Sequence, residues 1–264
     1  MKGRTTLALA ATLWLATGAA ASAHDTWIRA RNPAAANGTI LFDLSSGMEF
    51  PTLDTAIAPE RVARAGLRVN GREVPLLVRG EGRASLELLA THGSPGLAIA
   101  WVTLHPRILE LTPAQVREYL QEIAAPASVG EAWSARGGRW RERYVKHAKT
   151  CLRIGEAADG SWAEPVALAL EIVPESDPTA LRVGDRVAVR LLKNGAPLAG
   201  LAVGMEPRGR QAPLPRSDAE GRVSFVVERP GPLLLSATEL RPSSSGENEW
   251  ESDFTTLVLD VAPR

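Results

Sequence analysis

Short apolar segments that alternate with turn-forming residues constrain the fold of this chain more than any other feature. In the first half of the chain, such segments occupy residues 39–44, 67–69, 74–78, 84–89 and 97–104. Gly, Pro, Asn and Asp separate them, and segments of this length are typical of β-strands rather than helices. Asn70-Gly71 favours a tight turn and predicts a hairpin over residues 67–78. Residues 43–50 interrupt the pattern with Ser45-Ser46-Gly47 and are predicted to form a loop.

The same pattern continues on both sides of a boundary that we place near residues 158–165. Strands are predicted at 144–154 before the boundary and at 166–172, 185–192, 198–205, 223–227, 233–237 and 255–261 after it. Asn194-Gly195 and residues 217–221 supply turns between them. About seven short strands over roughly 100 residues are typical of an immunoglobulin-like sandwich. We therefore predict a mainly β protein with two β-sandwich-like domains at 24–160 and 165–264, of which the second is immunoglobulin-like.

One short helix is predicted within the first domain, near residues 113–124. Thr112 can cap its start, and Pro113 suits the first helical position. The apolar residues that share one face follow at spacings of four and three: Val116, Leu120 and Ile123. Pro126 ends the helix, and residues 127–143, which contain several glycines and charged residues, are predicted to form a loop.

The N-terminus has the composition of a signal peptide. Lys2 and Arg4 precede an uncharged apolar run over residues 5–20, and Ala21-Ser22-Ala23 has the small-x-small pattern of a cleavage site. The run is shorter than the ~20 apolar residues that cross a bilayer as a helix. We therefore expect residues 1–23 to be removed on export, leaving a soluble periplasmic or secreted protein without a transmembrane segment.

Composition and missing motifs argue against several functional classes. The chain has 30 Lys and Arg against 30 Asp and Glu, without a basic block, so nucleic-acid binding is not expected. It has no nucleophile elbow, phosphate-binding loop or dinucleotide fingerprint, and we expect no enzymatic activity. The single cysteine, Cys151, cannot form an internal disulfide. We predict it to be a buried apolar residue, with a thiolate metal ligand as the alternative.

Cleavage after Ala23 would make His24 the first residue of the mature protein. A free α-amine has a pKa of about 7.7–8.0, so it loses its proton far more readily than a lysine. The amine and the imidazole of His24 can then close a chelate ring around nickel, cobalt, copper or zinc, and Asp25 adds a carboxylate. Such binding should weaken at acid pH, because the nitrogen ligands must be deprotonated. The alternative is that His24 and Asp25 simply begin the first strand.

The remaining ligands are less well defined by the sequence. His105 ends a strand before Pro106, and alternation along residues 143–149 places His147 with Val145, opposite Tyr144 and Lys146. We include His105 and His147 as candidate metal ligands, with ordinary hydrogen-bonded histidines as the alternative. The chain contains no H-x-x-x-H or C-x-x-C spacing that would support a local metal motif.

Two further groups of residues contain side chains that can bind metal ions. The first is an alternating acidic series: Glu247, Glu249, Glu251 and Asp253. Carboxylates on one strand face could bind calcium, although a solvated strand edge is the simpler interpretation. The second comprises Met48 and Met205, which could bind cuprous copper but are more typical of packing residues.

Several stretches of this chain, taken in order, match one known family. The quoted matches are Ala23-His24-Asp25-x-Trp27, Tyr144-x-x-x-Ala148-Lys149-Thr150, Pro165-Val166-x-Leu168-x-Leu170-Glu171-Ile172-Val173-Pro174, Leu181-x-x-Gly184-Asp185, Gly195-x-Pro197-Leu198-Ala199-Gly200 and Trp250-Glu251-Ser252. Through them the chain resembles exported bacterial proteins of undefined function, described as periplasmic components associated with nickel or cobalt uptake. The resemblance implies an N-terminal β domain, a following sandwich domain and metal handling. It extends to His24 and Asp25 but not to His105 or His147.

Two functional hypotheses follow from these patterns. The first is a periplasmic accessory protein that binds a divalent transition metal, nickel, cobalt or copper, and presents it to a membrane transporter. The second is a non-catalytic β-sandwich module of the cell envelope that binds a protein or a surface polymer.

Overall fold

The computed structural model describes residues 24–31, 38–155, 160–207, 213–244 and 249–264. The predicted signal peptide, residues 1–23, lies outside these described residues. No helix within the described ranges is long and apolar enough to cross a membrane.

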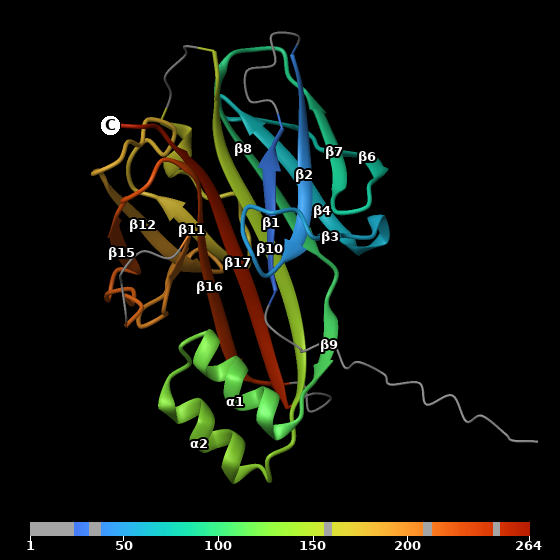
Figure 1. The fold of residues 1–264 in the computed structure, drawn as a ribbon, viewed down its shortest axis with the longest axis vertical. Coiled ribbons are helices and arrows are strands. Elements are labelled where there is room, and N and C mark those ends of the chain that lie inside the picture. Colours follow the sequence, from blue (N-terminus) through green and yellow to red (C-terminus); the bar gives the residue numbers. More distant parts are fainter. Residues whose placement is uncertain (1–23, 32–37, 156–159, 208–212, 245–248) are drawn as a thin grey trace, which may run out of the picture.

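The described strands form three sheets (Figure 1). The N-terminal sheet contains, in spatial order, β1 (Asp25–Ala30), β2 (Thr39–Gly47), β7 (Leu86–Thr91) and β6 (Leu77–Glu81), with β3 (Thr55–Ala56) also paired to β2. The central sheet contains, in order, β14 (Gly204–Glu206), β16 (Gly231–Pro242), β17 (Trp250–Val261), β10 (Arg141–Ile154), β8 (Gly96–Leu104), β4 (Val62–Val69) and β5 (Arg72–Pro75), with β9 (Arg107–Glu110) also paired to β10. The C-terminal sheet contains β11 (Leu170–Pro174), β12 (Arg186–Lys193) and β13 (Ala196–Pro197), with β15 (Arg222–Val226) on the other edge of β12.

The central sheet is covered on both faces, and β8 shows why. Successive side chains of a strand point to opposite faces. Ile99 and Trp101 therefore pack with the C-terminal sheet, whereas Ala100 and Val102 pack with the N-terminal sheet. Burial on both sides explains the almost unbroken apolar sequence of this strand. The prediction of a mainly β protein built from packed sheets is confirmed.

One sheet contains strands from both sides of the predicted boundary at 158–165. β10, before the boundary, pairs in parallel with β17, after it, and His147 lies opposite Thr255 in this register. β16 then continues the sheet beyond β17. The two predicted domains, 24–160 and 165–264, thus share the central sheet as a common layer. The division of the chain into two domains stays a prediction.

The predicted helix is confirmed as α1 (Pro113–Glu122), and its start has the expected cap. The Thr112 side chain accepts a hydrogen bond from the Gln115 backbone amide, and the Gln115 side-chain oxygen accepts one from the Thr112 backbone amide. Two short 3-10 helices, η1 (Pro59–Arg61) and η2 (Ser161–Ala163), were not expected.

The predicted loop at 127–143 is wrong, because α2 (Ala127–Ala135) occupies its first part and β10 begins at Arg141. Burial of Trp133 explains this helix. Trp133 joins an aromatic cluster in which Trp140 and Trp250 stack with ring centroids 4.7 Å apart. These contacts come from distant strands and outweigh the low helix propensity of Gly130.

Other strand boundaries also differ from the predicted ones. The predicted loop at 43–50 is strand as far as Gly47, because Ser45 pairs with Trp27 and its hydroxyl donates to Ala84 O at 2.7 Å. The predicted strand at 166–172 begins only at Leu170, since the Val166 amide donates to the side chain of Glu171. The predicted strand at 198–205 is short and begins at Gly204. The predicted turn at Asn70-Gly71 is confirmed by the pairing of Val69 with Arg72. The hairpin predicted over 67–78 ends at Pro75, because residues 77–78 belong to β6 of the N-terminal sheet.

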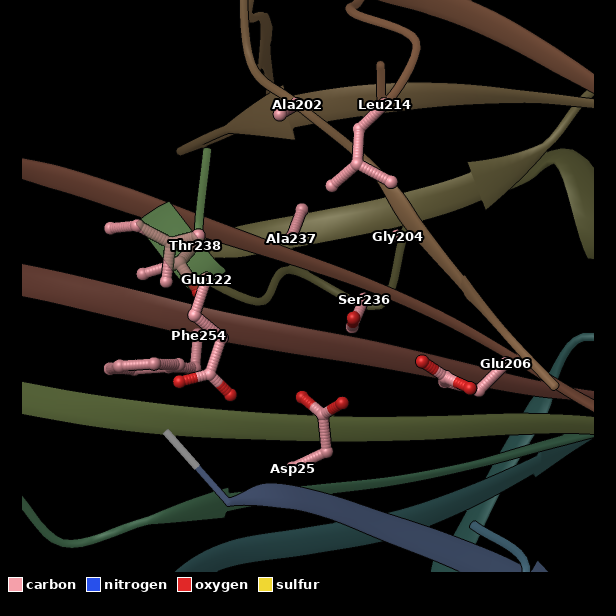
Figure 2. Close-up of a pocket in the computed structure, with 11 residues that line it drawn as sticks. Asp25, Glu122, Ala202, Gly204, Glu206, Leu214, Ser236, Ala237, Thr238 and Phe254 are labelled. Atoms are coloured by element: carbon pink, nitrogen blue, oxygen red, sulfur yellow. The ribbon is translucent and has the colours of Figure 1, made fainter. Parts of the chain in front are cut away.

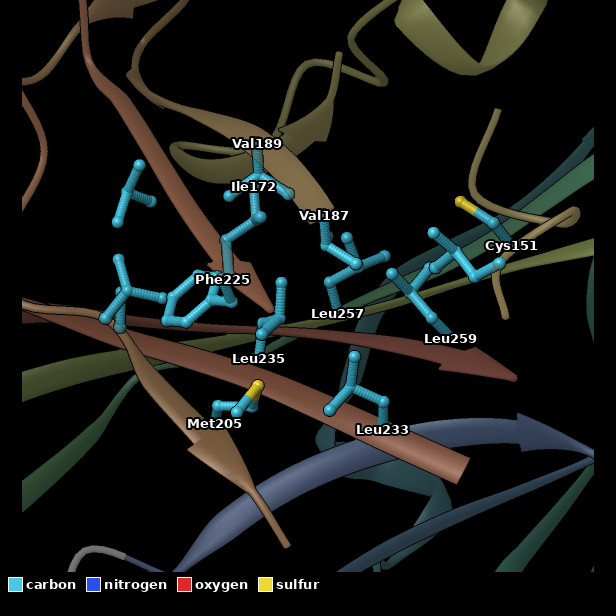
Figure 3. Packing of buried hydrophobic residues seen from close by; sticks show 14 of the residues in the cluster. Cys151, Ile172, Val187, Val189, Met205, Phe225, Leu233, Leu235, Leu257 and Leu259 are labelled. Atoms are coloured by element: carbon cyan, nitrogen blue, oxygen red, sulfur yellow. The ribbon is translucent and has the colours of Figure 1, made fainter. Parts of the chain in front are cut away.

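The core between the central and C-terminal sheets contains Cys151, as Figure 3 shows. Its side chain belongs to the same buried cluster as Leu257 and Leu259 of β17, and the residue is 3% exposed. Burial raises the pKa of the Cys151 thiol to about 11. A thiol that stays protonated is a poor metal ligand, so the prediction of a buried apolar residue is confirmed.

Candidate functional site

A pocket lies on the face of the central sheet that carries Ser236 and Phe254, between the start of β1 and the end of α1. Three carboxylates come to it from distant parts of the chain: Asp25 from β1, Glu122 from α1 and Glu206 from β14. Figure 2 shows all three pointing into the same space. We call this the acidic pocket. Its other lining residues are Ile123, Ala202, Gly204, Leu214, Ser236, Ala237, Thr238 and Phe254.

The acidic pocket makes it unfavourable for Asp25 to carry its negative charge. Burial is the largest cause and raises the pKa of Asp25 to about 6. The charges of Glu122 and Glu206 raise this pKa further, while Lys146 and a hydrogen bond with Ser236 lower it. A proton or another cation at Asp25 therefore removes an electrostatic penalty that the fold has created.

Lys146, on β10, fixes the chain next to this pocket. Its ammonium donates a hydrogen bond to the carbonyl of His24. It also lies 5.5 Å from the ring centroid of Phe254 and 5.8 Å from that of Tyr144, within the range of cation–π attraction. Burial lowers the pKa of Lys146 to about 8, although Asp25 opposes this shift. The residue predicted to become the N-terminus is thus held beside the acidic pocket.

His147 is remote from this pocket because it lies on the other face of the central sheet. Asp253 and Phe254 are consecutive on β17, so their side chains point to opposite faces. Phe254 lines the acidic pocket, whereas Asp253 Oδ1 lies 3.2 Å from His147 Nε2. His147 Nδ1 lies 3.0 Å from the hydroxyl of Thr103. Both ring nitrogens of this buried histidine are therefore engaged in protein hydrogen bonds.

His105 is likewise not among the residues that line the acidic pocket. It follows β8, it is exposed, and its backbone amide donates to the carbonyl of Arg61 at 2.7 Å. Among the residues that the structure describes, no group of three His, Cys, Asp or Glu side chains is arranged to hold a metal ion. The structure thus keeps His24 next to Asp25, but it does not bring the four predicted ligands to one place.

The acidic series on β17 forms ion pairs instead of a separate cation site. Arg241 donates to Glu251 at 3.2 Å and to Asp253 at 3.0 Å, and Lys193 also donates to Asp253. Burial raises the pKa of Asp253, but the hydrogen bonds from His147, Lys193 and Arg241 outweigh it and hold this pKa well below its usual range. Glu247 lies outside the described residues.

The two methionines have different surroundings. Met205 packs in the core between the central and C-terminal sheets, as expected for a packing residue. Met48 is 59% exposed.

Three residues of the acidic pocket and its rim were not predicted from the sequence: Glu122, Glu206 and Lys146. Glu122 is the last residue of a helix and Glu206 ends a three-residue strand. Neither has a neighbour in sequence that would mark it as a site residue. The sequence pattern correctly predicted that Lys146 and His147 lie on opposite faces of their strand, but it gave Lys146 no functional role.

Comparison with known proteins identifies one family. A family model described as "Domain of unknown function (DUF4198)" matches residues 21–239. No protein with a curated description matches the chain. The nickel or cobalt association implied by the resemblance is not part of the family's description.

Solved structures match only weakly. The "D0-D1 domain of Intimin" is 13% identical with a TM-score of 0.22, covering 88% of this chain and 97% of that one. The ectodomain of mouse nectin-like molecule 4 is 13% identical with a TM-score of 0.20, covering 90% of this chain and 64% of that one. The fibronectin(III)-like modules of Clostridium thermocellum CbhA are 9% identical with a TM-score of 0.18, covering 89% and 95%. Similarities this weak carry no argument about this chain.

Proposed function

This chain belongs to the family described as a domain of unknown function, DUF4198, and we propose that it is a non-catalytic protein of the cell envelope that binds a divalent transition-metal ion at its processed N-terminus. One observation carries the proposal. The carboxylate of Asp25, directly after His24, lies partly buried in a pocket that two further carboxylates line. A bound cation would relieve the charge repulsion that this arrangement creates.

The donor set of the proposed site suits nickel, cobalt or copper. After cleavage, His24 offers an α-amine and an imidazole, and Asp25 offers a carboxylate oxygen. Nitrogen donors with one carboxylate are a common ligand set for these metals. Glu122 and Glu206 would add negative charge to the same pocket. His105 and His147 have no part in this proposal, because neither lines the pocket of Asp25.

Lys146 is the element of the site that opposes a metal ion. Its ammonium carries a positive charge close to His24, where it binds the carbonyl oxygen. Because its pKa is lowered to about 8, the lysine can lose this charge at less cost than an exposed lysine. Metal binding should therefore strengthen as pH rises, because Lys146 loses its positive charge and because nitrogen ligands such as those of His24 bind a metal only when deprotonated.

The proposed role in the envelope is to hold the metal for uptake or handling, with a membrane metal transporter as the partner. Support for this role comes from the predicted signal peptide and from the family resemblance described for the sequence.

The test is a metal titration of processed protein whose N-terminal residue has been verified as His24 by mass spectrometry. We expect about one nickel, cobalt or copper ion per chain. A variant with one alanine inserted before His24 keeps every side chain but moves the amine, and it should bind at least about tenfold more weakly. His92→Ala, in a turn where the ring contacts the carbonyl of Ser94, is the matched control. Unchanged affinity in the alanine-extended protein would contradict the proposed chelate.

The second hypothesis, a module that binds another protein, is favoured by a different observation. This is a stretch of β16 whose outer edge has no strand partner among the described residues.

A further inference from the structure

A groove continues from the acidic pocket along β16. A second pocket shares Ile123, Ala202 and Thr238 with the acidic pocket, so the two are contiguous. Its remaining lining residues are Ala124, Ala125, Pro126, Leu198, Ala199, Gly200, Leu201, Arg216, Glu239 and Leu240. We call the combined feature the edge groove.

The edge groove begins on the face of the central sheet that carries Ser236 and Phe254 and continues to the edge of that sheet. Its floor includes consecutive residues of β16, 236–240, whose side chains alternate between the two faces. One wall, 123–126, comes from the end of α1, and the other, 198–202, comes from the segment after β13. At the edge, the groove therefore lies between the segment after α1 and the segment after β13.

The strand edge at the bottom of this groove is unpaired over part of its length. β16 pairs with β17 from Gly231 to Pro242. On its other side, β14 pairs only with residues 234–236. Within the described ranges, no strand pairs with the outer edge of residues 237–241. These five residues span about 17 Å of open edge.

The walls of the groove are held at a fixed separation by Arg216. One of its guanidinium nitrogens donates to Gly200 O at 2.8 Å, and the other donates to Ala124 O at 2.6 Å. The side chain thus ties the segment after β13 to the segment after α1. A groove braced in this way is formed before any ligand arrives, which reduces the entropic cost of binding.

We propose that the edge groove binds an extended segment of another protein, which adds as a strand to the outer edge of residues 237–241. Backbone hydrogen bonds to an exposed edge are the usual basis of this mode of recognition, and pockets on either side select side chains. The apolar residues Ile123, Leu201 and Leu240 favour apolar side chains along the groove.

Charge complementarity specifies one feature of the partner segment. The end of the groove next to β14 is the acidic pocket, with Asp25, Glu122 and Glu206. A lysine or arginine at the matching position of the segment would place its positive charge among these carboxylates. The occupant that fits best is therefore an extended, mostly apolar segment with one basic residue near one end.

The experiment uses processed protein and synthetic six-residue peptides of alternating Val and Thr, with either Lys or Glu as the terminal residue. Binding is measured by fluorescence anisotropy in the presence of a chelator, so that the proposed metal site has no influence on the result. We expect the Lys peptide to bind at least about tenfold more tightly than the Glu peptide. We also expect it to slow hydrogen exchange of backbone amides within 237–241.

Two matched variants locate the site. Ala199 and Ala196 are both exposed, but only Ala199 lines the groove. Ala199→Trp should fill the groove and weaken binding of the Lys peptide at least about tenfold, whereas Ala196→Trp should leave this binding unchanged. Glu122→Gln should reduce the preference for Lys over Glu. Equal binding of both peptides, equal effects of the two tryptophans, or exchange protection elsewhere would each overturn the proposal.

Discussion

Replacing Asp25 by asparagine should stabilise the metal-free protein at neutral pH. Burial raises the pKa of Asp25 from 3.8 to about 6, which means that the folded state prefers the protonated, uncharged carboxyl. The contribution of the protonated Asp25 carboxyl to the free energy of unfolding is fully present below pH 3.8 and is lost as pH rises through 6. Above that pH, the folded chain must carry a charge that the unfolded chain carries more easily. Asparagine is never charged, so Asp25→Asn avoids this penalty.

The size of the effect follows from the shift. A shift of about two pKa units at ~1.4 kcal/mol per unit corresponds to about 3 kcal/mol, which is the upper limit of the gain at pH 7.5. For a chain of this size, that gain corresponds to an increase in melting temperature of roughly 6–12 °C. At pH 4 the two proteins should differ little, because the carboxyl of the wild type is then protonated in the folded state.

The assay is thermal unfolding of metal-free wild type and Asp25→Asn at pH 4, 5.5 and 7.5. Asp260→Asn is the control, because that side chain is 57% exposed at the far end of β17 and should show no pH-dependent gain. Added nickel should then stabilise the wild type but not Asp25→Asn. If the variant is less stable than the wild type at pH 7.5, the reasoning about this pocket is wrong.

Three other predictions concern single buried side chains. Lys149→Met should lower the free energy of unfolding, measured in urea, by about 3–5 kcal/mol. The reason is that the carboxylate of Glu171 stays buried without the ammonium that now lies 2.7 Å away, and an equally stable variant would contradict this. Glu142→Ala should lower the free energy of unfolding by about 2–4 kcal/mol, because the hydroxyl of Tyr119 loses its buried acceptor. Hydrogen exchange in α1 and α2 should become faster, and unchanged exchange would argue against that role. Cys151, whose pKa is raised to about 11, should react with a thiol reagent at pH 8 only on unfolding, and rapid labelling of the native protein would refute its burial.

Elements whose signals are local could be predicted from the sequence. The cap at Thr112, the turn at Asn70-Gly71 and the alternation that separates Lys146 from His147 all depend on residues a few positions apart. The helix α2 could not be predicted in this way, because its stability depends on packing Trp133 against aromatic residues from β10 and β17. Strand ends were displaced for the same reason, as with Ser45, whose hydrogen bonds come from other segments.

The candidate site shows the same division. The sequence by itself determined that His24 and Asp25 are adjacent, and it predicts a cleavage site directly before them. Only the tertiary structure decided what surrounds them. It placed Glu122 and Glu206 in the pocket of Asp25 and left His147 on the opposite face of the sheet. It also began β14 only at Gly204, opposite Ser236, which leaves the following part of the β16 edge open. The physical reason is that charge repulsion, burial and strand pairing depend on distances in space, and these distances join residues far apart in the chain.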